Sequence, residues 1–86
     1  PDGLDLEAVR KALVEFPGVV EVHDLHTWAL GSKEAVLTVH VVGDEAKTSG
    51  EQLRREASAM LEERFGVEHA TLQVEAVPCG GHAVHA

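Results

Sequence analysis

The segment from Glu34 to Val42 carries the alternation that most restricts how this chain folds. From Leu37 to Val41 every second residue is aliphatic, and the residues between them are Thr38 and His40. Side chains of an extended strand point alternately to its two faces. One face of this predicted strand is therefore wholly apolar and has to be covered by another layer, while the other face carries polar groups.

A helix is predicted before this strand, over residues 4–16. Apolar residues recur there at helical spacing: Leu6, Val9, Leu13 and Phe16. Asp2 or Asp5 is available to cap the start of the helix. Pro17-Gly18 ends it, because proline cannot continue the helical hydrogen-bond ladder.

A second helix is predicted between Thr48 and Gly66. Its start has a capping-box signature, either Thr48 with Glu51 or Ser49 with Gln52. Its apolar stripe consists of Leu53, Ala57, Met60, Leu61 and Phe65. Gly66 is placed to stop it.

Two further strands complete the pattern. Residues 19–28 are rich in β-branched side chains and predict a strand that the turn residues 31–33 connect to the strand of residues 34–42. Residues 69–77 predict the third strand, with Thr71, Gln73 and Glu75 on one face. The order α-β-β-α-β predicts a two-layer α+β sandwich in which both helices cover one face of a three-stranded sheet.

Size and charge restrict the function classes. With 86 residues the chain forms one small domain whose hydrophobic core is only marginally sufficient to stabilise the fold. Oligomerisation would add to its stability. A net charge of −8 argues against nucleic acid as a partner and favours the attraction of cations. The single cysteine excludes an internal disulfide and favours a reducing, cytosolic setting. No apolar run is long enough to span a bilayer, and the start at Pro1 suggests a piece of a longer protein.

Histidines in strand-forming sequence point to a metal. The chain has six histidines and no tyrosine, and the histidines gather in the first two strands and near the end of the chain. A buried polar group without a partner destabilises the fold by roughly 1–3 kcal/mol. Histidines in these strands therefore indicate a functional use that compensates for this cost. Candidate ligands on the strands are His23, His40, Glu75, His26 and Asp24. Imidazole nitrogen together with carboxylate oxygen is a donor set that suits Zn²⁺, with Cd²⁺, Co²⁺ or Ni²⁺ tolerated.

The parity of the first strand, that is, which of its alternating side chains lie on the uncovered face, is ambiguous. The uncovered face takes either His23 with Thr27, or Asp24 with His26 and Trp28, and a bulge near Asp24 would resolve the conflict. Residues 78–86 are predicted to form a flexible C-terminal tail after a domain of residues 1–77. Cys79, His82 and His85 make the tail a possible additional metal site. His69 is expected to face solvent.

Several of these segments together resemble the cytoplasmic C-terminal domain of cation diffusion facilitators, which are zinc and heavy-metal efflux transporters. The matching segments are Pro17-Gly18-Val19, the run from Val22 to Trp28, Gly31-Ser32, residues 37–42 and residues 69–75. The resemblance implies a metallochaperone-like (ferredoxin-like) fold with a mixed sheet. It also implies a homodimer at the cytoplasmic side of the cell membrane that zinc closes to favour transport, and a partner in the transmembrane domain of the same transporter.

The resemblance also bears on individual residues. His23 and His40 match histidines that coordinate regulatory zinc in relatives, and Glu75 lies where the family has a histidine or an acidic ligand. Val77 departs from an aspartate ligand of some relatives, which leaves room for Asp24, His26 or the tail. Two alternatives stay open: a soluble copper metallochaperone, which the single cysteine argues against, and an assembly module with structural histidines. No nucleophile has an evident His and acid partner, so an enzyme is not expected.

Overall fold

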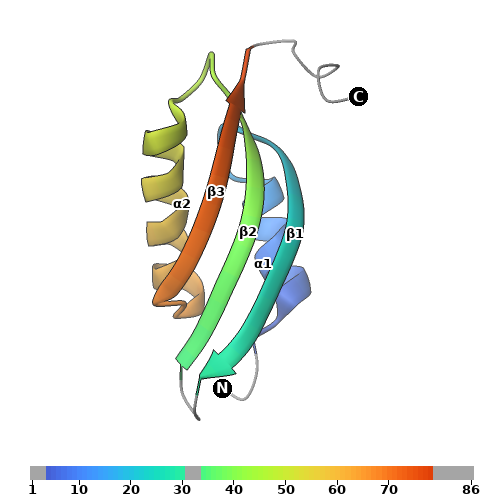
Figure 1. The fold of residues 1–86 in the computed structure, drawn as a ribbon, viewed down its shortest axis with the longest axis vertical. Coiled ribbons are helices and arrows are strands. Elements are labelled where there is room, and N and C mark those ends of the chain that lie inside the picture. Colours follow the sequence, from blue (N-terminus) through green and yellow to red (C-terminus); the bar gives the residue numbers. More distant parts are fainter. Residues whose placement is uncertain (1–3, 31–33, 79–86) are drawn as a thin grey trace.

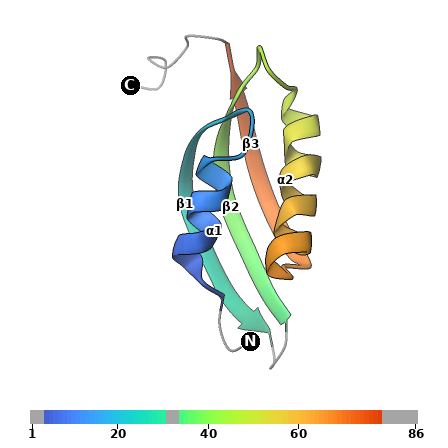
Figure 2. The same ribbon diagram turned by 180° about the vertical axis from the view of Figure 1, so that it is seen from behind.

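The computed structural model describes residues 4–30 and 34–78. The elements are α1 (Leu6–Val14), β1 (Val19–Leu30), β2 (Glu34–Asp44), α2 (Gly50–Phe65) and β3 (His69–Val77). Their order confirms the predicted α-β-β-α-β pattern, and the strands form one sheet with both helices on the same face, behind the sheet in Figure 1 and in front of it in Figure 2.

The sheet is mixed, with strand order β1-β2-β3. β1 pairs with β2 antiparallel, whereas β2 pairs with β3 in parallel. A parallel pair needs a crossover connection, and α2 supplies it on the same face of the sheet that α1 covers (Figure 2). The result is a two-layer, metallochaperone-like α+β sandwich with one face of the sheet left open.

Helix α1 is shorter than the predicted range of residues 4–16. The side chain of Asp5 accepts hydrogen bonds from the backbone N–H groups of Glu7 and Ala8 at 3.1 and 3.2 Å, so Asp5 is the cap and the helix starts after it. At the other end the N–H of Phe16 donates to the carbonyl of Leu13, which tightens the last turn. The chain then reverses through Gly18, whose φ of 94° favours glycine.

Helix α2 starts and ends where the sequence predicts. Ser49 rather than Thr48 is the cap, and its side chain accepts from the N–H of Gln52 at 3.0 Å. The capping box is only half formed, because the side chain of Gln52 donates to Glu56 instead. Arg54 donates to Glu51 at 2.7 Å and lowers the pKa of the Glu51 carboxyl. Gly66 ends the helix in the left-handed conformation.

Strands β1 and β2 extend beyond their predicted ranges, residues 19–28 and 34–42. The hairpin pairing continues to Leu30 opposite Glu34, which extends β1 by two residues. β2 reaches Asp44 because Asp44 pairs with Val77 of β3 and its N–H donates to the carbonyl of Gly18 at 2.8 Å. β3 has the predicted bounds, and the predicted turn at residues 31–33 lies outside the described residues.

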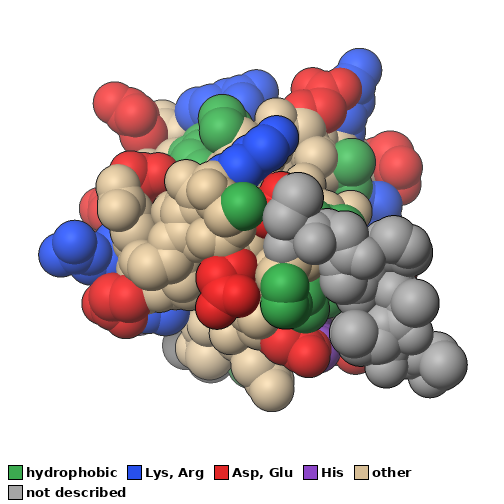
Figure 3. All heavy atoms as spheres, turned by 90° about the horizontal axis from the view of Figure 1, so that it is seen from above, with side chains coloured by type: hydrophobic (Ala, Val, Ile, Leu, Met, Phe, Trp, Pro, Cys, Tyr) green, Lys and Arg blue, Asp and Glu red, His purple; other side chains and the backbone are tan. Residues whose placement is uncertain are grey.

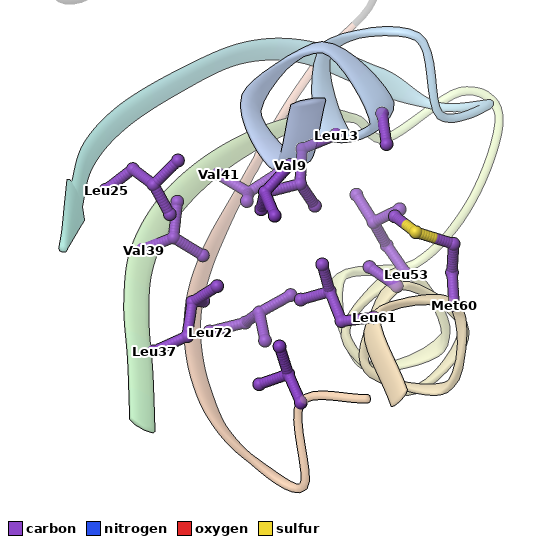
Figure 4. Packing of buried hydrophobic residues seen from close by; sticks show 13 residues of the cluster. Val9, Leu13, Leu25, Leu37, Val39, Val41, Leu53, Met60, Leu61 and Leu72 are labelled. Carbon is purple, nitrogen blue, oxygen red and sulfur yellow. The ribbon is translucent and has the colours of Figure 1, made fainter. Parts of the chain in front are cut away.

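The core lies between the helices and the inner face of the sheet (Figure 4). Each element contributes to a single cluster of buried residues: Val9 and Leu13 from α1, Leu25 from β1, Leu37, Val39 and Val41 from β2, Leu53, Ala57, Met60 and Leu61 from α2, and Leu72 from β3. The alternation from Leu37 to Val41 is thus confirmed as the apolar face. No polar side chain is buried among the described residues.

The surface carries charges of both signs. Seen from the end at which β3 finishes, acidic side chains are spread around the molecule with lysines and arginines between them (Figure 3). Among the described helices none is long and apolar enough to cross a membrane.

Gly43→Ala is expected to destabilise the fold by about 1–3 kcal/mol, the usual range for overpacking. A Cβ at Gly43 would lie 2.5 Å from Cδ2 of Leu53, which is itself buried and has little room to move. Urea unfolding with a chelator present measures the change. Gly50→Ala is the matched control, since a Cβ there meets nothing closer than 3.7 Å. Equal stability of the two variants would contradict the close contact between β2 and α2.

Candidate metal centre

The face of the sheet that the helices leave uncovered, here called the open face, carries the candidate ligands. Its β1 side chains are Glu21, His23, His26 and Trp28; its β2 side chains are Val36, Thr38, His40 and Val42; its β3 side chains are His69, Thr71, Gln73, Glu75 and Val77. All three strands therefore contribute polar groups to one surface. The prediction that His40 and Glu75 share this face is confirmed.

A β-bulge at Asp24 decides the parity of β1. His23 lies opposite His40 and His26 lies opposite Thr38, so Asp24 and Leu25 together occupy the space of one residue on β2. Asp24 has a φ of 53°, a left-handed conformation that aspartate tolerates better than most residues. A bulge near Asp24 was predicted. Its consequence differs from both alternatives for which side chains of β1 lie on the uncovered face. It places His23 and His26 on the same face and turns Leu25 into the core.

Two histidines and two glutamates gather near the end of the sheet where β3 finishes. The rings of His23 and His40 are 5.5 Å apart between centroids. Nε2 of His40 lies 3.5 Å from Oε1 of Glu75, and Nε2 of His23 lies 3.5 Å from Oε1 of Glu21. We call Glu21, His23, His40 and Glu75 the His–Glu cluster. With Val42 and Val77 it lines a hollow of about 110 Å³.

His40 is the central member of this cluster. It lies on the middle strand, and its Nε2 atom is shielded from solvent without a hydrogen-bond partner. Glu75 is within ion-pair distance of that atom, but the geometry does not form a hydrogen bond. A shielded nitrogen beside a carboxylate is costly unless another group uses its lone pair or proton. A bound cation would satisfy it.

A second hollow of about 340 Å³ lies beside the first on the open face. His40 borders both hollows, and the second is also lined by Asp24, His26, Thr38, Thr71 and Gln73. The structure therefore divides the predicted ligands. His23, His40 and Glu75 meet in the smaller hollow, whereas Asp24 and His26 border the larger one.

The described residues do not provide a full set of metal ligands in one place. Within residues 4–30 and 34–78, no group of three or more His, Cys, Asp or Glu side chains is arranged to hold a metal ion. The His–Glu cluster offers nitrogen and oxygen donors suited to zinc, but as two separate His–Glu pairs. Cys79, His82 and His85 lie outside the described residues. The described residues alone thus leave the ligand set of a zinc ion incomplete.

Sequence reasoning missed Glu21. It has the same parity as His23 on β1, two residues before it, and that spacing was the signal for its position on the open face. His69 is exposed at the start of β3, as expected. Trp28, which is 49% exposed, lies on the open face rather than in the core.

The chain is similar to known efflux proteins over most of its length. The family described as the cytoplasmic domain of cation efflux proteins matches residues 1–77. The metal cation efflux system protein CzcD of Cupriavidus metallidurans is 46% identical over 79 residues, which are 92% of this chain and 25% of that protein. The zinc transporter ttm-1 of Caenorhabditis elegans is 40% identical over 87% of this chain and 18% of its own length. The chain thus spans a quarter or less of these relatives.

A solved structure also matches. The metal-bound C-terminal domain of the CzcD transporter from Cupriavidus metallidurans superposes with a TM-score of 0.75 at 44% sequence identity. The match covers 84% of this chain and 99% of that domain. The fold and the extent of the domain therefore agree with those of a domain solved with metal.

Proposed function

This chain belongs to the family of cation efflux protein cytoplasmic domains, and we propose that it is the zinc-binding, dimer-forming regulatory domain of a divalent-cation efflux transporter. Its partners would be a second copy of itself and the transmembrane domain of the same full-length protein. Residues 1–77 would form the domain and residues 78–86 a tail at the cytoplasmic side of the membrane.

The observation that carries this proposal is the environment of His40. Its shielded and unpartnered Nε2 atom faces the Glu75 carboxylate, and the His23 ring lies alongside. Zinc accepts both imidazole nitrogen and carboxylate oxygen, and cadmium, cobalt and nickel accept the same donors. His23, His40 and Glu75 would hold the ion, and Glu21, Asp24 and His26 are nearby donors on the same face.

The incomplete ligand set supports dimer formation as part of this proposal. An ion bound by groups of two molecules favours their association increasingly as its concentration rises. Binding of zinc would thereby draw two domains together, and this movement would favour transport by the membrane-embedded part. The names of the relatives as metal cation efflux and zinc transport proteins support zinc as the ion.

Zinc at ten times its Kd is expected to stabilise the folded state by about 1.4 kcal/mol. For a domain of this size that raises Tm by roughly 6–11 °C. Differential scanning calorimetry measures the shift, and sedimentation velocity of the same samples measures the dimer fraction, which should rise with zinc. Magnesium is the control cation, since it prefers oxygen ligands. If neither the Tm nor the dimer fraction changes when zinc is added, the proposal is refuted.

One observation favours an alternative, an assembly module whose histidines are structural. The described residues hold no ready group of three ligands. Such a module would form a dimer whose amount and melting temperature are the same in zinc and in chelator. The same pair of measurements therefore separates the two functions.

A further inference from the structure

Two carboxylates flank the middle strand of the open face from opposite sides. Glu21 of β1 and Glu75 of β3 both pair with Val42 of β2, so these three residues form one row across the sheet. His23 and His40 lie opposite each other in the next row of the same face. All five residues line the hollow of about 110 Å³. The row therefore brings one carboxylate to this hollow from each side of β2.

We propose that Glu21 is a ligand of the ion bound in this hollow. It is the fourth donor, beside His23, His40 and Glu75. The inference rests on the proposed zinc-binding function and identifies a further ligand for it. Two imidazole nitrogens and two carboxylate oxygens of one chain complete the tetrahedral shell that zinc prefers.

The spacing of the two imidazoles fits a shared ion. In a tetrahedral site with Zn–N distances of about 2.0–2.1 Å, the centres of two coordinating rings are about 5 Å apart. The ring centroids of His23 and His40 are 5.5 Å apart. Their planes are inclined by 49°, so the rings are not stacked against each other. The two imidazoles can therefore bind one ion without a shift of the backbone.

The two glutamates can turn toward the same ion. As the side chains lie, each carboxylate oxygen is 3.5 Å from the Nε2 atom of one imidazole, which gives two separate His–Glu pairs. The side chains of Glu21 and Glu75 are 44% and 56% exposed, so close packing does not hold either one in its rotamer. Rotation of the two side chains joins the pairs into one set of four donors.

Position selects Glu21 among the other donors of the open face. Among the described residues it is the only acidic residue besides Glu75 that lines the smaller hollow. Asp24 and His26 border the larger hollow instead. Val77 lines the smaller hollow but offers only an apolar side chain. Glu21 is thus the donor that the smaller hollow holds in addition to the three proposed ligands.

The charge of such a site is balanced. Two carboxylates cancel the double charge of the ion, and coordinating imidazoles are neutral. Without an ion, Glu21 and Glu75 place two negative charges at one end of a chain whose net charge is −8, and these charges oppose the approach of a second copy there. Zinc held by one chain therefore still favours the dimer, because it removes this repulsion.

The test compares the zinc affinity of variants of the full chain by isothermal titration calorimetry at neutral pH. Glu21→Gln is expected to bind zinc at least about tenfold more weakly than the parent, as loss of a group at a metal site does. Glu45→Gln is the matched control. Glu45 is an exposed glutamate next to Val77, to whose carbonyl its N–H donates, but it does not line the hollow. Loss of a surface charge alone should weaken binding by at most about fivefold.

Glu21→His separates a ligand from a nearby charge. Zinc binds imidazole as well as carboxylate, so histidine at a ligand position should restore most of the affinity that glutamine loses. A neutral imidazole does not replace a residue that acts only through its negative charge. Because Glu21 is half-exposed, all of its variants should melt like the parent in chelator.

The outcomes separate this inference from the proposed function. If His40→Ala loses zinc but Glu21→Gln binds like the parent or like Glu45→Gln, the cluster is the site and Glu21 is not a ligand. The inference is also wrong if Glu21→His binds as weakly as Glu21→Gln. If His40→Ala binds zinc unchanged, both the inference and the proposed function fail.

Discussion

His40→Ala is expected to bind zinc about a hundredfold more weakly than the parent chain, or not measurably. Among the described residues His40 alone borders both hollows of the open face, and its Nε2 atom faces the Glu75 carboxylate. Losing a direct ligand should cost at least as much as losing a group that supports one, which costs about 10–100-fold. Isothermal titration calorimetry measures the affinity.

The same variant separates a ligand from a structural histidine. Alanine removes a shielded nitrogen that has no hydrogen bond, so the metal-free fold should lose little stability or gain some. A structural histidine would give the opposite pattern, with lower stability in chelator and unchanged zinc binding. His69→Ala is the matched control, since it removes an imidazole from the same face at the far end of β3. It should bind zinc as the parent does.

Leu61→Ala is expected to destabilise the domain by about 3–4 kcal/mol, within the range for truncating a buried leucine. Leu61 is 0% exposed on α2 and points into the cluster shared with Leu37 and Leu72 (Figure 4). Alanine is the best helix former, so the loss reflects packing and not the helix itself. Small domains have only about 5–15 kcal/mol in total, so this is a large fraction.

Urea unfolding in chelator measures this change without the contribution of metal. Val14→Ala on α1 is the control, because Val14 is 51% exposed and its truncation leaves no cavity. We expect it to change the free energy of unfolding by less than about 0.5 kcal/mol. A Leu61→Ala cost below that of Val14→Ala would mean that α2 does not pack on the sheet as described.

Local chemistry made most of the fold predictable from the sequence. The helix caps and the stop at Gly66 act through their own backbone neighbours: Asp5 and Ser49 are each one of two residues that the sequence offered as caps, and the stop at Gly66 is confirmed. Strands β1 and β2 were predicted too short, because the residues at which they end depend on their pairing partners. Asp44, for example, is extended only because Val77 and Gly18 lie beside it.

The sequence predicted which face of the sheet carries the candidate site, but not all of the residues that form it. Alternation placed His40 and Glu75 together, and mixed parity around Asp24 indicated the bulge. Glu21 was missed although its two-residue spacing from His23 was a signal, because the parity of β1 stayed ambiguous until the bulge at Asp24 placed His23 on the open face. The described residues hold no ready group of three ligands, and strand periodicity does not govern donors outside the strands.

The irregularities of β1 also affect how copies of this chain can meet. β1 is an edge strand, and its register shifts twice, between Val19 and Glu21 and between His23 and His26. Each shift interrupts the row of backbone donors and acceptors that a neighbouring strand would need in order to extend the sheet. The distortion that puts the two imidazoles on one face thus also disfavours the pairing of this edge with a strand of another molecule.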